Sequence, residues 1–298
     1  MSTWTLDSAA DQTGRVAIVT GSNSGIGFET AAALALKGAT VVMACRNATK
    51  GEAARTAILE QAPGGDVTLM SLDLSSLSSV EAFATAFGKV HDRLDLLINN
   101  AGVMIPPYTQ TEDGFELQFG TNHLGHYALT GRLLPLITKT GGARIVTVAS
   151  LAHKFGKIDF DDLNHEKSYW AWPAYGQSKL ANLLFTAELQ RRLKAAGHDT
   201  IATAAHPGWT ATNLQANSFV ARVFNPLMAM KPPEGALPTL RAALDPDATG
   251  DAYFGPAGMG EMKGPPVVVP RTKAAQDAGV AERLWGVSAE LTGVAYLK

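Results

Sequence analysis

Residues 15–27 read Arg-Val-Ala-Ile-Val-Thr-Gly-Ser-Asn-Ser-Gly-Ile-Gly, and this stretch decides the fold. An apolar run of strand length leads into a glycine-rich turn, and helical spacing follows. Gly21 allows a sharp turn off the strand, Gly25 allows a pyrophosphate to approach the backbone, and Gly27 allows close helix–strand packing. Amides at the helix start then point at the phosphates. A tight turn needs no ligand, but this position favours nucleotide binding by residues Gly21, Asn23, Ser24, Gly25, Ile26 and Gly27.

Five more apolar runs rich in Val, Ile and Leu follow, and each is short enough to be a strand buried on both faces. They lie at 40–44, 67–72, 94–98, 144–148 and 200–205. Stretches with helical spacing occur at 30–37, 50–61, 80–90, 115–137 and 180–194. Such alternation predicts an α/β fold of the Rossmann type, in which helices cover both faces of a doubly wound parallel sheet.

The domain count is set by the continuity of this alternation. The length of 298 residues is compatible with two modest domains. The alternation nevertheless runs from 15 to about 253 without a linker, a repeat or a change in composition. We therefore expect a single domain over 15–298, preceded by an N-terminal extension over 1–14.

Composition restricts the partners and the compartment. Lys and Arg number 25 against 27 Asp and Glu, for a net charge of −2, and no basic block stands out, so nucleic acid is not an expected partner. The single Cys45 excludes an internal disulfide and a Cys-rich metal site. Residues 1–14 do not look like a signal peptide, and no run of about 18 apolar residues is present to span a membrane. We expect a cytoplasmic protein, with no membrane partner, that binds a small molecule.

The end of the second apolar run bears on the choice of cofactor. An NAD enzyme usually places an acid here, against the ribose 2′-hydroxyl, but this sequence has Arg46. The guanidinium is suited to a 2′-phosphate, so NADP(H) is preferred and NAD(H) remains possible. The alternative is an ordinary surface Arg at a strand end.

Two further turns follow the third and fourth apolar runs. Asp73-Leu74 follows the third, and Asn100-Ala101-Gly102 follows the fourth. Both lie where the adenine and ribose of a dinucleotide cross the sheet edge. Asn and Gly are also common in turns, so each motif alone is weak.

Tyr175 and Lys179 are four residues apart and therefore share one helix face. An ammonium next to a phenol stabilises the phenolate, so the pKa of Tyr175 is expected to fall from its usual value of about 10. Tyr175 would then be able to exchange protons near neutral pH. The alternative is an exposed helix turn with an extended Lys side chain.

Two long segments, 151–174 and 208–233, interrupt the alternation directly after predicted strands. We interpret them as a cover for an apolar substrate, with ordinary packing or a dimer contact as the alternative. Their aromatic and apolar residues are Tyr169, Trp170 and Trp172 in the first, and Trp209, Phe219, Phe224 and Met228 in the second, with Pro226, Pro232 and Pro233.

Taken in order, these motifs closely resemble the short-chain dehydrogenase/reductase family over about 14–253. The set comprises Thr20-Gly21-x-x-x-Gly25-x-Gly27, Asn100-Ala101-Gly102, Asn122, Ser150, Tyr175-x-x-x-Lys179 and Pro207-Gly208. Finer details are similar to the retinol-dehydrogenase-like branch, namely residues 21–27, 44–46, 122–126, 149–153 and the tail at 283–293. Vertebrate members of that branch often carry a membrane anchor that is not found here, so a retinoid substrate does not carry over.

The resemblance implies roles for individual residues. Tyr175 would donate or remove the proton, and Ser150 would hydrogen-bond the substrate oxygen. Lys179 would hold the nicotinamide ribose and lower the pKa of Tyr175. Asn122 would hold a water in a proton relay, and Pro207 and Gly208 would contact the cofactor. The family also implies a homodimer or homotetramer that uses the helices over 115–137 and 173–194.

The sequence therefore predicts an NADP-dependent oxidoreductase, either an alcohol dehydrogenase or a carbonyl reductase. The interval of 25 positions from Ser150 to Tyr175 suggests a bulky or apolar ketone, aldehyde or alcohol. One alternative is a catalytically silent NADP-binding sensor or scaffold, against which the intact set of four catalytic residues argues. A lyase or epimerase is disfavoured because only about 45 residues follow Tyr253.

Two histidine patterns invite other chemistry. His123 and His126 are three residues apart on a predicted helix, but no Cys or carboxylate ligands accompany them, so no metal is expected. His153 follows Ser150 by three residues, but the Gly-x-Ser-x-Gly turn of a hydrolase does not surround that serine.

Overall fold

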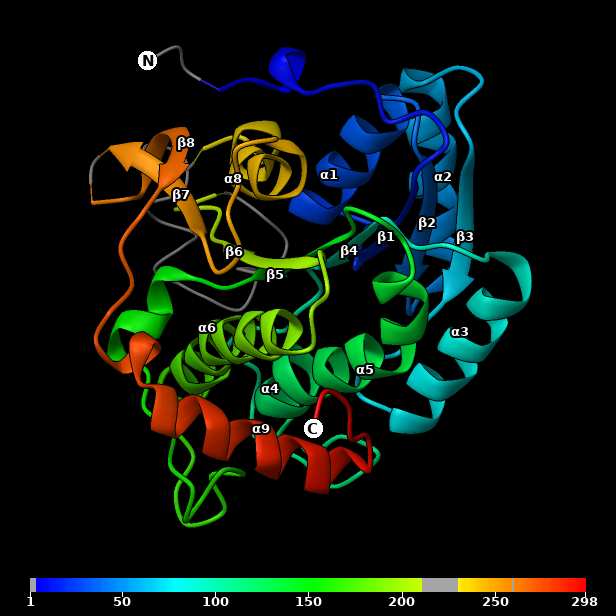
Figure 1. Ribbon diagram of the computed structural model, residues 1–298. Helices are drawn as coiled ribbons and strands as arrows, with labels where there is room; N and C mark the ends of the chain where they lie inside the picture. The colour runs from blue at the N-terminus through cyan, green and yellow to red at the C-terminus, as the bar shows by residue number, and fades with distance from the viewer. Residues whose placement is uncertain (1–3, 211–229, 259) are drawn as a thin grey trace.

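Figure 1 shows the computed structural model, which describes residues 4–210, 230–258 and 260–298. Its strands are β1 (Val16–Thr20), β2 (Thr40–Cys45), β3 (Val67–Ser71), β4 (Leu96–Asn99), β5 (Arg144–Val148), β6 (Ile201–Ala205), β7 (Tyr253–Gly258) and β8 (Lys263–Val268). Its α-helices are α1 (Gly25–Leu36), α2 (Ala48–Gln61), α3 (Leu77–Val90), α4 (Leu117–Phe119), α5 (Gly125–Thr138), α6 (Ala171–Ala195), α8 (Pro232–Leu244) and α9 (Ala278–Thr292). Short 3₁₀ turns are η1 (Leu6–Ser8), η3 (Leu151–Phe155) and η5 (Ala274–Gln276), and η2 (Gly120–Leu124) is π-helical.

The strands form one sheet in the order β3-β2-β1-β4-β5-β6-β7-β8. Neighbours from β3 to β7 are parallel, and β8 runs antiparallel to β7. The order reverses at β1, so the chain winds in both directions from the centre of the sheet. The predicted single-domain, doubly wound α/β fold is confirmed.

Helices cover both faces of this sheet, as Figure 1 shows. α1, α2 and α8 lie on one face, and α3, α5 and α6 lie on the other. Within β1, Ala17 and Val19 belong to the core under α1 and α8, whereas Val16 and Ile18 belong to the core under α3 and α5. The strand is therefore apolar on both faces because both faces are buried.

Besides the helices α8 and α9, the sequence did not predict the hairpin at the sheet edge or the packing of the N-terminal segment. The strands β7 and β8 form a hairpin at the sheet edge, where Pro265 and Pro266 are tolerated because an edge strand need not donate every hydrogen bond. The N-terminal segment also packs on the domain, since Trp4 and Ala9 are buried in the core that α1 and α8 line.

The helix predicted over 115–137 is present as one continuous helical run over 117–138, but it is not α-helical throughout. The chain forms α4, the π-helical η2 and then α5. A β-carbon on Gly125 would overlap the Leu74 main chain, so α5 approaches the loop after β3 very closely. The Asn122 side chain meanwhile bonds to the Val103 backbone. These two contacts fix the helix at its irregular turn, and π-turns of this kind often occur at functional sites.

The last helix, α9, lies outside α5 and α6 (Figure 1). Its Trp285 ring stacks on Phe185 of α6, with ring centroids 5.9 Å apart, and meets Tyr127 of α5 edge-on at 5.1 Å. These are the helices that the family resemblance implies for a contact between subunits. In this chain, α9 covers part of that surface.

None of the helices in the described part of the chain is both long and apolar enough to cross a bilayer.

Candidate active site

A cavity of about 620 Å³ opens at the carboxyl ends of the parallel strands. Ligands bind at this edge in open sheets of this type. Ser150 lines the cavity, whereas Asn122 is not among its lining residues in the ranges described. The cavity brings together all the predicted cofactor residues: Gly21, Asn23, Ser24, Gly25, Ile26, Gly27, Arg46, Asp73, Leu74, Asn100, Ala101, Gly102, Tyr175, Lys179, Pro207 and Gly208.

The glycine-rich turn after β1 has two positions where a side chain cannot fit. Gly21 has φ of 67°, and an added β-carbon would lie 2.9 Å from Ala101. A β-carbon on Gly27 would overlap the Asn100 side chain and the Gly21 carbonyl. Glycine is therefore needed here because β1, α1 and the loop after β4 come together without room for a side chain.

Thr20 joins the ends of β1 and β4. Its Oγ1 accepts hydrogen bonds from the amides of Asn100 and Ala101, both at 2.9 Å, and its carbonyl accepts from Asn100 Nδ2 at 2.7 Å. These bonds hold the loop after β4 beside the glycine-rich turn. Both loops then line one wall of the cavity.

A buried histidine continues this network. His126 Nδ1 donates to the Asn122 carbonyl at 3.0 Å, so its Nε2 accepts from Thr20 Oγ1 at 2.9 Å. Burial lowers the pKa of His126 to about 4, which keeps the ring neutral as this arrangement requires. The histidine thus links the first strand to the irregular turn before α5. Sequence reasoning considered it only as a metal ligand.

The end of β2 carries more positive charge than predicted. Exposed Arg46 lines the cavity, and its Nη1 lies 4.0 Å from Asp73 Oδ2. Asn47 and Lys50 also line the cavity, and the Asn47 side chain caps α2 by accepting from the Lys50 amide at 2.9 Å. The signal that sequence reasoning missed is this cap, because it places Lys50 in the first helical turn beside Arg46.

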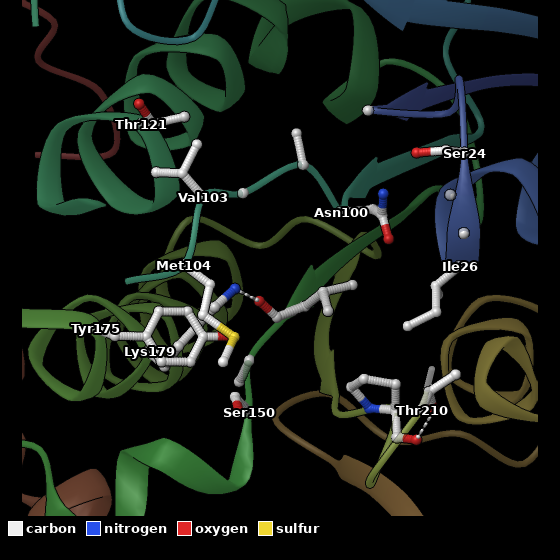
Figure 2. Close-up of a pocket in the computed structure, with 18 of the residues that line it drawn as sticks. Ser24, Ile26, Asn100, Val103, Met104, Thr121, Ser150, Tyr175, Lys179 and Thr210 are labelled. Carbon is white, nitrogen blue, oxygen red and sulfur yellow. Dashed lines mark hydrogen bonds between the residues drawn. The ribbon is translucent and has the colours of Figure 1, made fainter. Parts of the chain in front are cut away.

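Ser150, Tyr175 and Lys179 meet at the other end of the cavity (Figure 2). Ser150 follows β5 and caps η3, where its side chain accepts from the Ala152 amide at 3.2 Å. Tyr175 and Lys179 lie one turn apart on α6 and are only 5% and 3% exposed. The predicted shared helix face is therefore present, and it is buried.

The pKa shifts in this group differ from the sequence-based expectation. Burial raises the pKa of Tyr175 to about 12, although a hydrogen bond with Ser150 opposes the rise. Burial lowers the pKa of Lys179 to about 8. The expected fall in the Tyr175 pKa is absent because desolvation of the phenolate dominates, and the Lys179 ammonium instead donates to the Val148 carbonyl at 3.1 Å.

Asn122 lies behind the cavity wall. Its Oδ1 accepts from the Val103 amide at 2.8 Å, and its Nδ2 donates to the Val103 carbonyl and to Ser178 Oγ, both at 3.0 Å. A β-carbon on Gly102 would lie 3.0 Å from Asn122 Oδ1 and 3.6 Å from Lys179 Nζ. The side chain therefore holds the loop after β4 next to Lys179, and its polar atoms are already hydrogen-bonded to protein.

The aromatic segment after β5 contributes less to the cavity than expected. Trp172 lines it, but within α6, where the ring packs edge-on against Phe155 at 6.2 Å. Trp170 is 72% exposed and does not line the cavity. Tyr169 points elsewhere, because its hydroxyl donates to the Pro106 carbonyl at 2.8 Å. Phe155, which the sequence did not single out, takes its place at the cavity.

The second long segment is described only at its ends. Trp209 lines the cavity, and Pro232 and Pro233 begin α8. The predicted contributions of Phe219, Phe224, Pro226 and Met228 lie outside the described residues. Other lining residues without a sequence signal are Val103, Met104, Thr121, Thr210 and Met262.

The histidines set aside in the sequence have separate protein partners. His123 Nε2 lies 2.9 Å from Ser288 Oγ of α9, away from the His126 network. His153 Nδ1 donates to the Ser150 carbonyl at 2.7 Å rather than contacting the hydroxyl. In the described part of the chain, no three His, Cys, Asp or Glu residues are grouped to hold a metal ion.

The sheet and the cavity at its carboxyl edge place the chain in the Rossmann-type class. Within that class, the family model described as "short chain dehydrogenase" matches residues 15–222. Retinol dehydrogenase 12 of Mus musculus is 43% identical over 94% of this chain and 87% of its own length. Retinol dehydrogenase 14 of Homo sapiens is 41% identical over the same shares. The chain therefore belongs to the short-chain dehydrogenase family, whose members are oxidoreductases.

Solved structures agree with this assignment. An uncharacterized protein from Mycobacterium paratuberculosis is 45% identical, with a TM-score of 0.84 over 99% of both chains. RhlG of Pseudomonas aeruginosa, solved as a complex with NADP at its active site, is 26% identical, with a TM-score of 0.65 over 81% of this chain and 94% of that one. The predicted family is confirmed, as is its retinol-dehydrogenase-like character at the level of sequence similarity.

Proposed function

We propose that this protein is an NADP-dependent oxidoreductase that acts on an apolar ketone, aldehyde or alcohol, with Tyr175 as the acid or base. One observation carries the proposal: Ser150, Tyr175 and Lys179 gather at one end of a cavity whose other end is the glycine-rich turn. In a dinucleotide complex, the turn would hold the phosphates, and the three side chains would hold the nicotinamide end.

The residues present fit such a cofactor. Gly25, with φ of 57°, places backbone without a side chain at the cavity, where a pyrophosphate can come close. No side chain caps the start of α1, so its amides are available to the phosphates. Arg46 and Lys50 supply two cations at the end of β2. A 2′-phosphate carries the charge that matches them, which favours NADP(H) over NAD(H). The NADP complex of RhlG supports the same choice.

The chain's own residues then act on a substrate oxygen. A bound nicotinamide would supply the hydride chemistry, to a carbonyl carbon or from an alcohol. Tyr175 donates its proton to the oxygen during reduction, since the raised pKa keeps the phenol protonated. Alcohol oxidation requires the Tyr175 phenolate as the base that accepts the hydroxyl proton, so the same raised pKa favours reduction near neutral pH. The Ser150 hydroxyl hydrogen-bonds the same oxygen as negative charge develops. Lys179, anchored on Val148, binds the sugar hydroxyls next to the nicotinamide.

The lining of the cavity supports an apolar substrate. The cavity that holds the three polar side chains is also lined by the apolar side chains of Met104, Met262, Trp209, Phe155 and Trp172. An apolar wall with few polar groups favours a substrate whose only polar atom is the reacting oxygen. The names of the relatives, retinol dehydrogenases, are in keeping with an apolar alcohol or aldehyde.

The test is turnover by purified protein. NADPH oxidation is followed by absorbance with a panel of aliphatic, aryl and polyene aldehydes and ketones, and NADP⁺ reduction with the matching alcohols. Both are repeated with NADH and NAD⁺. Turnover that prefers NADPH or NADP⁺ supports the proposal. Tight NADPH binding with no turnover on the panel would instead support a silent NADP-binding sensor or scaffold.

Location and assembly are parts of the same proposal. The family resemblance supports action in the cytoplasm as a homodimer or homotetramer. Cell fractionation tests the first, and light scattering during size-exclusion chromatography tests the second. Recovery with membranes, or a monomer at micromolar concentration, would contradict the respective part.

A further inference from the structure

The turn between β7 and β8 reaches the cavity with an unusual backbone. Glu261 has φ of 68°, in the left-handed region that a residue with a β-carbon rarely adopts. The next residue, Met262, lines the cavity. Strained backbone of this kind persists only where its surroundings enforce it, and it is common at functional sites. Glu261 lies beyond residues 15–222, the region that the family model matches.

The Glu261 carboxylate contacts two segments of the site at once. Its Oε1 accepts from Lys154 Nζ at 2.9 Å, and its Oε2 lies 3.1 Å from His206 Nε2. Lys154 belongs to η3, which begins immediately after Ser150. His206 directly precedes Pro207 and Gly208, two cavity residues. The carboxylate is only 17% exposed, so these contacts are less screened than those of a surface pair.

His206 transmits the contact to the backbone of the cavity wall. Its Nδ1 accepts a hydrogen bond from the Gly208 amide at 3.2 Å, which leaves the ring proton on Nε2 to be donated to Glu261. The ring is fully buried and packs so closely on β7 that a β-carbon on Gly255 would overlap it. It therefore has little room to move.

The same wall is held from a second side. The Met262 carbonyl accepts from the Trp209 amide at 3.0 Å, and a β-carbon on Gly208 would lie 2.5 Å from that carbonyl. The segment after β6 therefore contacts both the main chain of residues 260–262 and the Glu261 side chain. The ion pair of Glu261 with Lys154 links these contacts to the segment that carries Ser150.

We propose that Glu261 is a positioning residue that fixes the spacing between the Ser150 segment and the Pro207–Trp209 wall, by binding Lys154 and His206 simultaneously. This inference rests on the proposed function, because those two walls hold the substrate oxygen and the nicotinamide in it. Glu261 does not touch the reacting atoms. It acts by keeping Ser150 and the opposite wall at the distance that productive binding needs.

Two substitutions distinguish the effect of the Glu261 side-chain contacts from the effect of the left-handed backbone at this residue. Glu261→Gln keeps the shape but weakens both contacts, whereas Glu261→Gly removes them and suits the left-handed backbone. We expect kcat to fall about 3- to 10-fold in the first and about 10- to 100-fold in the second, since small misplacements in an active site are costly. If only the backbone conformation of residue 261 mattered, the kcat of Glu261→Gly would equal that of the wild type. The kcat of Glu261→Gln would be no higher than that of the wild type. That order of activities would overturn the proposal.

The matched control is Glu81→Gln. Glu81 also pairs with a basic side chain, that of Arg132 at 2.9 Å, but it is 60% exposed and lies on α3, away from the cavity. It should leave kcat unchanged. In all variants the dissociation constant for 2′,5′-ADP should stay within about threefold of the wild type, because Arg46 and Lys50 lie at the other end of the cavity. A loss of 2′,5′-ADP binding together with a lowered melting temperature would indicate general damage and contradict a positioning role.

A measurement that needs no turnover separates this inference from the proposed function. In protein labelled with ¹⁵N-histidine, NMR should show His206 as the neutral Nε2–H tautomer, assigned with His206→Asn, and Glu261→Gly should weaken protection of that proton from exchange. Where the wild type turns over substrate, the double variant Glu261→Gly/His206→Asn should lose no more activity than the worse single variant. An unprotected Nε2 proton in the wild type, or additive losses in the double variant, would refute the inference even in an active enzyme.

Discussion

Lys179 Nζ donates a hydrogen bond to the Val148 carbonyl at 3.1 Å, two residues before Ser150. The ammonium is thereby anchored to the end of β5 as well as to α6, and the dashed line that starts at Lys179 in Figure 2 marks this bond. The strand that presents Ser150 and the helix that presents Tyr175 are thus joined by the side chain of the third member of the group. Burial of Tyr175 and Lys179 raises the pKa of the phenol and lowers the pKa of the ammonium.

Tyr175→Phe should reduce kcat about 10²- to 10⁴-fold, because it removes the proton donor and leaves the ring in place. Steady-state NADPH oxidation measures the loss, and the dissociation constant for NADPH should change little. Tyr169→Phe is the matched control, since its hydroxyl bonds Pro106 outside the cavity. Equal activity of Tyr175→Phe and wild type would rule out the proposed acid.

Replacing Arg46 or Lys50 by Ala should weaken NADPH binding about 10- to 100-fold while leaving NADH binding nearly unchanged. The reason is the loss of a charge-assisted contact to the 2′-phosphate, worth about 1.5–3 kcal/mol. Isothermal titration calorimetry with both cofactors gives the ratio. Arg55→Ala, on the same helix but paired with Glu52, should leave that ratio unaltered. A parallel loss of NADPH and NADH affinity would contradict a role in recognising the 2′-phosphate.

Phe155→Ala and Trp172→Ala should raise KM for long-chain carbonyl substrates several-fold and leave short-chain ones unaffected. Each ring offers apolar surface at the cavity, and burial against a substrate contributes about 25 cal/mol per Å². A series of aldehydes of increasing length measures this dependence. Trp170→Ala should show the wild-type dependence, because that ring does not line the cavity. A loss that is equal at every chain length would argue against substrate contact.

Acid should destabilise the protein below pH 6.5. Burial lowers the pKa values of His123, His126 and His206 from 6.5 to about 3, 4 and 4. The unfolded chain therefore binds more protons than the folded chain between pH 6.5 and 4, so this stability is complete above pH 6.5 and is lost as the pH falls. Each histidine adds a slope of up to about 1.4 kcal/mol per pH unit.

Urea unfolding at pH 7.5, 6 and 5 measures this slope. His123→Gln should make the slope shallower, since it removes one buried imidazole that must otherwise stay neutral. His198→Gln, at a partly exposed position after α6, is the control and should leave it unchanged. A free energy of unfolding that does not vary over this range would contradict the prediction.

The sequence predicted β1, β2, β4, β5 and β6 because these strands are buried on both faces and read as largely apolar runs. It also predicted β3, an edge strand that is only partly buried. The sequence did not predict the hairpin of β7 and β8, because its glycine and proline residues are typical of turns. These residues are Gly255, Pro256, Pro265 and Pro266. Only the sheet edge makes them acceptable in strands. The π-helical turn between α4 and α5 was not predicted either, because it depends on contacts of Asn122 and Gly125 with loops elsewhere in the sequence.

Some features of the candidate site were also predictable from the sequence, and others were not. Residues such as Gly21, Tyr175 and Lys179 were predictable because their geometry is local to one turn or one helix. The pKa of Tyr175 was not, since sequence spacing shows the neighbouring Lys179 but not how deeply both are buried. Glu261 was equally hidden, because its contacts with Lys154 and His206 join segments more than fifty residues away.

The position of α9 has a consequence for how the chain acquires its structure. Ribosomes deliver the chain from its N-terminus, so α5 and α6 emerge well before α9. Until α9 arrives, the rings of Tyr127 and Phe185 lack the Trp285 ring that packs on both. A nascent chain paused before residue 278 therefore exposes aromatic surface that chaperones and proteases recognise. Once the last helix has formed, it covers these rings, and chaperones and proteases no longer have access to them.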